Sequence, residues 1–241
     1  MPQNRINILC TRNVDDALIQ DALSKGVAID VISFIRPEPA LTREALNEIQ
    51  KASMRSGAVI LTSVNAVETV VTGLDHQKTN PVGWKIFCIG YATKQSIVKN
   101  FGEKSIADVA DNGKELAKAI LDANVSEVIF FCGDQRRDEL PGSLKENKIG
   151  VKEIVVYKTL ATSKKIEKKY HGILFFSPSA VKSFFQKNKI DEQVMLFAIG
   201  NTTADEIRKF SKNKIVVSDV PDKKTLLNNV ISYFQMNPIH H

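Results

Sequence analysis

Short apolar runs alternate along this chain with longer segments in which apolar residues recur every three or four positions. The short runs predict buried parallel strands: INILC (6–10), AVILT (58–62), KIFCIG (85–90), VIFFC (128–132), GILFF (172–176) and VMLFAIG (194–200). The longer segments predict amphipathic helices: 41–52, 65–74, 93–102 and 203–212. Alternation of this kind predicts an α/β fold with doubly wound parallel sheets and helices on both faces. In such sheets, ligands bind beyond the carboxyl ends of the strands.

The same blocks occur twice, in the same order and at nearly the same spacing along the chain. AVILTSVNAV (58–67) matches GILFFSPSAV (172–181), and IFCIGYAT (86–93) matches LFAIGNTT (196–203). A third match pairs residues 106–120 with 216–231. More weakly, the strand–helix–strand segment 6–35 resembles 128–159. Recurrence of this kind indicates two similar copies of one α/β domain.

The order of the blocks predicts that one domain is inserted into the other. The N-terminal strand–helix–strand segment meets its partner blocks only at the C-terminal end of the chain. We therefore expect a discontinuous domain, 1–35 plus 160–241, and an inserted domain, 36–159. Both crossings read as extended: Pro37 and Pro39 oppose helix, and Val155–Tyr157 favours strand. Two such connectors predict a two-stranded extended hinge that permits domain motion around a cleft.

Four predicted strand-to-helix turns carry serine, threonine or glycine: TSVNAV (62–67), IGYAT (89–93), SPSAV (177–181) and IGNTT (199–203). A serine or threonine at such a place can cap the helix, and the outward N–H groups together with the helix dipole favour an anion. Gly90 and Gly200 would let a ligand approach the backbone. Capping alone is the ordinary role of one such turn. Four at one sheet edge, in duplicate, favour anion binding by at least two.

Two further strand ends carry arginine. Gly133 and the Arg136–Arg137 pair follow one strand, and Thr11–Arg12 follows its counterpart. Arginine there can hold a carboxylate bidentately or pair with a neighbouring acidic side chain. Tyr157 lies in the second crossing, where a tyrosine usually packs and makes one hydrogen bond.

The composition of the chain restricts the chemical class of its binding partner. Lys and Arg number 33 against 27 Asp and Glu, a net charge of +6, which suits nucleic acid, an anionic lipid or a polycarboxylate. The lysines are scattered, with no basic stripe interleaved with aromatics, which disfavours nucleic acid. No apolar run approaches a membrane span, and the first residues hold no apolar signal core. We therefore expect a soluble cytoplasmic protein without a membrane partner.

Metal chemistry is not indicated. Cys10, Cys88 and Cys132 are too far apart for a local ligand pair and read as reduced, buried thiols. The four histidines form no constellation with cysteine or aspartate, and His240 and His241 are either native or remnants of a tag.

Taken in order, the motifs resemble those of the uroporphyrinogen-III synthase family over nearly the whole chain. The matching positions are Thr11-Arg12, Thr62-Ser63 with Ala66-Val67, Gly90 with Thr93, Gly133 with Arg137, Leu140, Pro141 and Leu144, Val156-Tyr157 with Thr159, Ser177 to Val181, and Ile199-Gly200 with Thr202, Thr203 and Ala204. The departures are Asn13, where the family often has proline, and Lys94, where it has alanine.

The resemblance implies a cyclising lyase that closes hydroxymethylbilane, a linear tetrapyrrole with eight carboxylates, into uroporphyrinogen III. Water leaves ring A, ring D is inverted through a spiro intermediate, and no metal or cofactor is required. Tyr157 becomes the candidate general acid. The expected substrate-binding residues are Thr11, Arg12, Thr62, Ser63, Asn65, Ala66, Gly90, Thr93, Gly133, Arg137, Ser177, Ser179, Ala180, Gly200, Thr202 and Thr203. We expect a monomer.

Three alternatives remain at the level of sequence. A non-catalytic two-domain protein that closes on an anionic small molecule would have the same architecture. A transferase acting on a nucleotide-linked donor would need a diphosphate signature or an acidic metal-binding pair, and neither is seen. A regulatory relative that has lost activity is disfavoured by the intact motifs.

Overall fold

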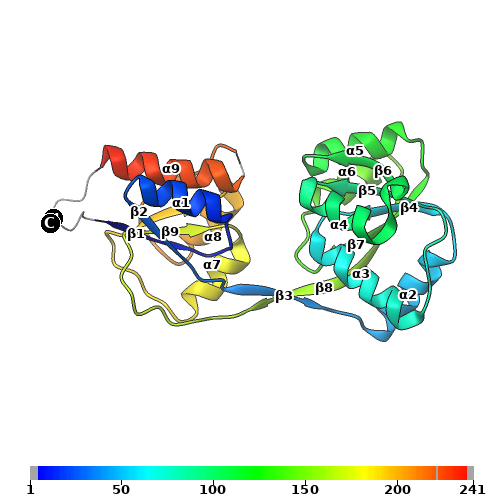
Figure 1. The fold of residues 1–241 in the computed structure, drawn as a ribbon, viewed down its shortest axis with the longest axis horizontal. Coiled ribbons are helices and arrows are strands. Elements are labelled where there is room, and N and C mark those ends of the chain that lie inside the picture. The colour runs from blue at the N-terminus through cyan, green and yellow to red at the C-terminus, as the bar shows by residue number, and fades with distance from the viewer. Residues whose placement is uncertain (1–4, 221, 238–241) are drawn as a thin grey trace. The chain divides into compact units, whose positions relative to one another are not determined.

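The computed structural model describes residues 5–220 and 222–237 and divides into two compact units (Figure 1). Unit 1 comprises Met1–Arg36 and Leu160–His241, and unit 2 comprises Pro37–Thr159. The predicted pair His240 and His241 lies outside the described residues. Each unit is an α/β layered structure with its own sheet and its own core.

Unit 1 contains a five-stranded parallel sheet in the order β11-β10-β9-β1-β2. Its strands are β1 (Ile6–Cys10), β2 (Val27–Val31), β9 (Gly172–Phe175), β10 (Met195–Ala198) and β11 (Ile215–Val217). Its helices are α1 (Asp16–Ser24), α7 (Pro178–Phe185), α8 (Asn201–Arg208) and α9 (Lys223–Met236). One face of the sheet packs on α1 and α9 through residues such as Phe197 and Leu226, and the other packs on α7 and α8 through residues such as Phe175 and Phe184.

Unit 2 contains a six-stranded sheet in the order β3-β8-β7-β4-β5-β6. Its strands are β3 (Ile35–Pro39), β4 (Gly57–Leu61), β5 (Trp84–Ile89), β6 (Ile106–Ala110), β7 (Glu127–Gly133) and β8 (Gly150–Ala161). Its helices are α2 (Arg43–Ser53), α3 (Val64–Gln77), α4 (Tyr91–Phe101), the 3-10 turn η1 (Glu103–Ser105), α5 (Gly113–Asp122) and α6 (Glu139–Glu146). Helices α2, α3 and α4 cover one face, and α5 and α6 cover the other.

The two chain crossings run through β3 and β8, which are neighbouring strands. The Ala40 N–H donates to the Val156 carbonyl at 2.7 Å, and the Thr162 N–H donates to the Phe34 carbonyl at 2.9 Å. From one bond to the other, the residue number falls from 40 to 34 on the first crossing and rises from 156 to 162 on the second. The strands β3 and β8 are therefore antiparallel. The extended conformation of both crossings follows from Pro37 and Pro39 on one and the β-branched residues of β8 on the other.

The duplication is visible in the order of the strands. Unit 1 reads β2-β1-β9-β10-β11 and unit 2 reads β8-β7-β4-β5-β6, with the matching sequence blocks at equivalent places. This is a doubly wound order: the chain adds strands toward one edge of the sheet and then toward the other. The strand order reverses between β1 and β9 in unit 1 and between β7 and β4 in unit 2. The predicted α/β class with two similar parallel-sheet halves is confirmed, and the reversal points are where a ligand is expected.

All four predicted helices form, with shifted ends: α2 begins at Arg43 rather than 41, and α3 ends at Gln77 rather than 74. Helix α4 begins at Tyr91 and α8 at Asn201, each directly after a glycine and two residues before the predicted start. Helix α8 ends at Arg208, well before the predicted 212. Beyond it, the Asn213 N–H bonds to the Ser211 hydroxyl at 3.0 Å, and a local side-chain bond of this kind competes with helical bonding.

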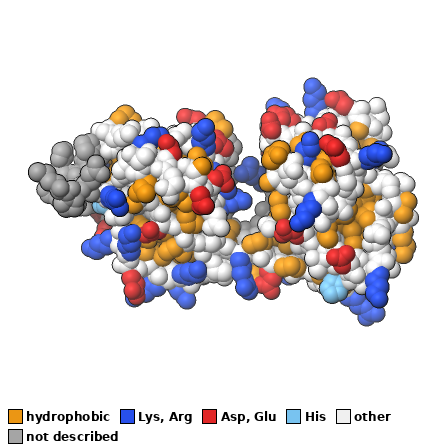
Figure 2. All heavy atoms as spheres, viewed as in Figure 1, with side chains coloured by type: hydrophobic (Ala, Val, Ile, Leu, Met, Phe, Trp, Pro, Cys, Tyr) orange, Lys and Arg blue, Asp and Glu red, His pale blue; other side chains and the backbone are white. Residues whose placement is uncertain are grey.

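The described part of the chain holds no helix long and apolar enough to cross a membrane. On the face seen in Figure 2, lysine and arginine are interspersed with acidic side chains in both units. On this face the positive charge is therefore dispersed rather than gathered into one stripe.

Candidate functional site

Ser63 follows the end of β4, at the point where the strand order of the unit 2 sheet reverses between β7 and β4. Its backbone is extended (φ −152°, ψ 150°), and its hydroxyl accepts the Ala66 N–H at 3.2 Å, which caps α3. The same hydroxyl donates to the phenol oxygen of Tyr157 at 3.2 Å. Two residues far apart in sequence, one after β4 and one on β8, are therefore joined across the carboxyl end of β7, which lies between those strands.

Tyr157 lies against Gly133, the last residue of β7. The pairing of β7 with β8 is irregular between Cys132 and Gly133, so that Gly133 pairs with Tyr157. A Cβ added at Gly133 would lie 2.5 Å from the tyrosine Cζ and 2.8 Å from its hydroxyl oxygen. Glycine is required here by the close approach of the ring, not by its own backbone conformation.

The backbone on both sides of the tyrosine is tied to the loop after β7. The Asp134 N–H donates to the Tyr157 carbonyl at 3.1 Å, and the Asp134 carboxylate accepts the Thr159 N–H at 2.9 Å. The tyrosine ring also packs on the core beneath α3. Its hydroxyl is thus held in place by backbone, packing and one side-chain hydrogen bond.

The equivalent place in unit 1 is built in the same way but holds no tyrosine. Ser177 caps α7 by accepting the Ala180 N–H at 3.2 Å, and its hydroxyl lies 3.1 Å from that of Ser179. Ser33 takes the position of Tyr157, and its hydroxyl donates to the Ile35 carbonyl at 2.6 Å. The two copies therefore share the capped turn and differ in what lies beside it.

Three predicted site threonines point into the protein. Thr11 is buried, and its hydroxyl donates to the Leu174 carbonyl at 2.7 Å, which fastens β1 to β9. Thr93 and Thr203 are also buried, each as the third residue of its helix. Of the four turns in which a serine or threonine could cap the helix, α3 and α7 have a serine cap, whereas the capping residue of α4 and α8 is glycine. Direct ligand contact by these three hydroxyls is therefore not supported.

The two glycine turns are not equivalent. Gly90 has φ of 80°, a conformation that favours glycine, whereas Gly200 has φ of 178°, which any residue adopts. An added Cβ would meet no atom within 4 Å at either position. Both turns leave room in front of the backbone, but only Gly90 is demanded by its dihedral angle.

The arginines separate into a paired group and an unpaired group. Arg136 bonds to Glu153 and, at 2.5 Å, to Asp138, so for this residue the ion-pair alternative is correct. Burial of Glu153 raises its pKa, but bonds from Lys145 and Arg136 outweigh it and leave the pKa below its usual value. No ion pair within the described ranges involves Arg137 or Arg12.

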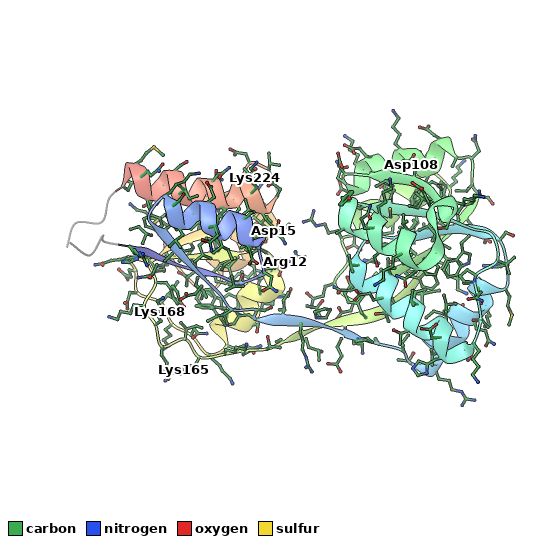
Figure 3. The ribbon with its side chains drawn as sticks, in the orientation of Figure 1. Arg12, Asp15, Asp108, Lys165, Lys168 and Lys224 are labelled. Carbon is green, nitrogen blue, oxygen red and sulfur yellow. The ribbon has the colours of Figure 1, made fainter. Side chains whose placement is uncertain are left out.

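Arg12 is exposed just beyond the end of β1, as Figure 3 shows, near Asp15 and far from the lysine-rich connector. In that connector Lys168 bonds to Asp30 at 2.7 Å, which lowers the pKa of the aspartate. Tyr170 donates to the same carboxylate at 2.8 Å, and its pKa is raised by burial and by this bond. The lysine run is therefore partly engaged within unit 1.

The cysteines are structural. Cys10, Cys88 and Cys132 are all buried and unpaired, as predicted, and burial raises the pKa of each thiol to about 11. Within residues 5–220 and 222–237, no three His, Cys, Asp or Glu side chains gather as a set of metal ligands.

Sequence reasoning missed two residues near the turns. Asp134 was overlooked because its role depends on the pairing of β7 with β8, which no local pattern reveals. Tyr91 opens α4 beside the predicted Gly90 and is 77% exposed. An aromatic residue directly after a glycine turn was a usable signal, since tyrosine offers a binding partner both an apolar ring and a polar hydroxyl group.

These features define a class, the two-unit α/β proteins that present helix N-termini at the carboxyl edges of duplicated parallel sheets. Within it, the chain belongs to the uroporphyrinogen-III synthase family, whose model, described as uroporphyrinogen-III synthase HemD, matches residues 16–228. The expected family and function are confirmed: the activity is that of a uroporphyrinogen-III synthase, in haem and tetrapyrrole biosynthesis. A non-catalytic binding role is not favoured.

Known proteins resemble this chain in sequence and in fold. Uroporphyrinogen-III synthase of Saccharomyces cerevisiae is 27% identical over 223 residues. The match covers 79% of this chain and 81% of the yeast protein. The fold is similar to that of the Helicobacter pylori synthetase, with a TM-score of 0.65, 16% identity and coverage of 95% and 99% of the two chains. A mutant synthase of Thermus thermophilus gives a TM-score of 0.60 at 13% identity, over 96% and 99%.

Proposed function

We propose that this chain acts as a cyclising hydro-lyase that converts hydroxymethylbilane into uroporphyrinogen III. The hydroxyl of ring A leaves as water and produces a cationic azafulvene. The substituted carbon of ring D attacks this centre to form a spiro intermediate. Fragmentation and reclosure then invert ring D, and loss of a proton restores the aromatic pyrrole. Family membership supports the overall reaction, and the roles of individual residues are our proposal.

The eight substrate carboxylates are proposed to bind the turns of both units, which act as two domains, 1–35 plus 160–241 and 36–159. Support comes from the free N–H groups at the first turns of α3 and α7, from the open backbone at the glycines, and from two exposed arginines without an ion pair. The proposed contact residues are Thr62, Ser63, Asn65, Ala66, Gly90, Gly133 and Arg137 in unit 2, and Arg12, Ser177, Ser179, Ala180, Gly200 and Thr202 in unit 1. Thr11, Thr93 and Thr203 are proposed to stabilise these turns as buried side chains, without contacting the substrate.

Tyr157 is the proposed general acid for departure of the hydroxyl group. The carrying observation is the hydrogen bond from Ser63 to the phenol oxygen at 3.2 Å. Because that oxygen accepts from Ser63, the phenol proton is left to be donated elsewhere. The position next to Gly133, at the carboxyl edge of the sheet, supports donation to a substrate bound there.

Most of the catalysis is proposed to come from positioning. The electron-rich pyrroles make the azafulvene accessible, so the protein has mainly to fold a flexible chain so that ring D reaches ring A. Holding two reacting centres together in this way contributes roughly 7–11 kcal/mol. This explains why one tyrosine, rather than a pair of acid and base, is sufficient.

The test is Tyr157→Phe, which keeps the ring and removes only the hydroxyl group. Turnover of hydroxymethylbilane is expected to fall about 10²-fold, toward the lower end of general acid effects, with KM little changed. Tyr233→Phe is the control for loss of a tyrosine hydroxyl, because Tyr233 lies beside His171 and Met195 at the amino ends of the unit 1 strands, away from the turns. An unchanged turnover number for Tyr157→Phe contradicts the acid role.

We further propose that the enzyme works as a monomer in the cytoplasm. A single chain carries both sets of turns, so a second copy is not needed to complete the binding residues. The octacarboxylate substrate is water-soluble, which favours an enzyme acting in an aqueous compartment. Light scattering of the purified chain tests the monomer: a mass of about twice 26.8 kDa contradicts it.

A further inference from the structure

The internal duplication offers a natural comparison between two serines. Ser63 and Ser177 occupy equivalent turns, and each accepts the N–H three residues ahead at 3.2 Å. Ser177 has the hydroxyl of Ser179 as its second partner, at 3.1 Å. Ser63 instead donates to Tyr157. Capping therefore explains one bond of each serine and leaves the bond to the tyrosine as the feature particular to unit 2.

The bond has a defined direction. The Ser63 oxygen accepts the Ala66 N–H, and its single proton is given to the phenol oxygen. On its other side the phenol is confined by the backbone of Gly133, with 2.8 Å from the hydroxyl oxygen to an added Cβ. The hydroxyl group of the tyrosine is fixed in place, and its own proton is turned away from Ser63.

We propose that Ser63 is a positioning residue for the reaction, which acts through Tyr157 rather than only through the substrate. This inference rests on the proposed role of Tyr157 as general acid. When the phenol gives up its proton, its oxygen gains negative charge, and the Ser63 hydroxyl becomes a donor to an anion. A hydrogen bond to a charged acceptor is roughly twice as strong as one to a neutral acceptor. Ser63 therefore stabilises the transition state more than the bound substrate, and so raises kcat.

The experiment is a double-mutant cycle with Ser63→Gly and Tyr157→Phe, assayed by steady-state turnover of hydroxymethylbilane. Glycine is chosen because it is nearly as good a helix cap as serine. Ser63→Gly is expected to lower kcat by about tenfold, the scale of one such bond. In the Tyr157→Phe background it is expected to cause no further fall in kcat, because the acceptor is then gone.

Two variants guard against a trivial explanation. Ser177→Gly removes the equivalent hydroxyl group, which has no tyrosine beside it, and is expected to raise KM rather than lower kcat. Ser63→Thr keeps the hydroxyl and is compatible with the extended backbone at this position, so it is expected to restore kcat to within about twofold of the wild type. Thermal unfolding of each variant checks that the fold is kept. Failure of Ser63→Thr to restore kcat, with the fold intact, overturns the inference.

The cycle separates the two proposals. If Tyr157→Phe leaves kcat unchanged, the acid role fails and the inference falls with it. If Tyr157→Phe lowers kcat but Ser63→Gly lowers it equally in both backgrounds, the acid role stands and the inference is overturned, because Ser63 then acts on the substrate or the helix. Loss of the Ser63 effect in the phenylalanine background is the result that supports the inference.

Discussion

Replacing Gly133 with alanine puts a methyl group where the ring of Tyr157 lies. The new carbon would be 2.5 Å from Cζ and 2.7 Å from Cε2, against a comfortable separation of about 3.5–4.0 Å between carbon atoms. The ring must retreat by about 1 Å to relieve the clash. The Ser63–Tyr157 bond is already at 3.2 Å and is lost beyond about 3.5 Å, so a movement of this size disturbs it.

The cost has two measurable parts. Overpacking of a well-filled site destabilises a protein by about 1–3 kcal/mol. Misplacement of a reacting group by about 1 Å costs about 10²-fold in rate. We therefore expect Gly133→Ala to lower the turnover of hydroxymethylbilane about 10²-fold and the free energy of unfolding by about 2 kcal/mol.

The assay pairs steady-state turnover with urea unfolding. The matched control is Gly142→Ala in α6, where an added Cβ meets no atom within 4 Å. Alanine is favoured over glycine inside a helix, so this variant should keep its turnover and unfold with the same or slightly higher free energy. If Gly133→Ala turns over within about twofold of the wild type, the close approach of the tyrosine ring does not govern the reaction.

Three further predictions concern the turns and the ion pairs. Gly90→Ala should lower the free energy of unfolding by about 1 kcal/mol because of its positive φ, whereas Gly200→Ala should be nearly neutral; urea unfolding compares them, and equal losses contradict the distinction. Arg137→Gln should raise KM about tenfold with little change in kcat, since uniform carboxylate binding is removed; an unchanged KM places the arginine outside the site. Glu153→Gln should cost about 1 kcal/mol at pH 7. Because its folded pKa is lowered, this difference should shrink as the pH falls below 4.5, and a constant difference refutes the ion-pair account.

The architecture could be predicted because its signals are local and repeated. Buried strands are continuous apolar runs, and the recurrence of blocks around Ser63 and Ser177 gave the duplication without knowledge of any contact. The order of the blocks also placed Tyr157 on a crossing, which β8 bears out as an extended strand. These inferences needed only the periodicity of the side chains and the order of the segments.

The details of the site depended on information that is not local. The sequence placed Thr93 and Thr203 at the start of their helices, but both helices begin two residues earlier, which turns these side chains toward the core. The Ser63–Tyr157 bond depends on the irregular pairing between β7 and β8, which is set by strands distant in sequence. The sequence analysis placed the starts of α4 and α8 too late and could not predict the register of β7 with β8. These two gaps account for most of what it did not find.

The asymmetry between the two copies is the more general point. Duplication supplied two capped turns, and only one of them stands beside a tyrosine. In our account both copies bind carboxylates, and the chemistry depends on the copy with Tyr157.

The most direct test of the account is the isomer of the product. Freshly generated hydroxymethylbilane is incubated with the purified wild-type chain, oxidised to the porphyrin and separated by chromatography, with a reaction lacking the chain run in parallel. The account predicts that the chain yields the type III isomer while the control yields the spontaneous type I isomer. Formation of the type I isomer alone, at the same rate with and without the folded chain, contradicts it.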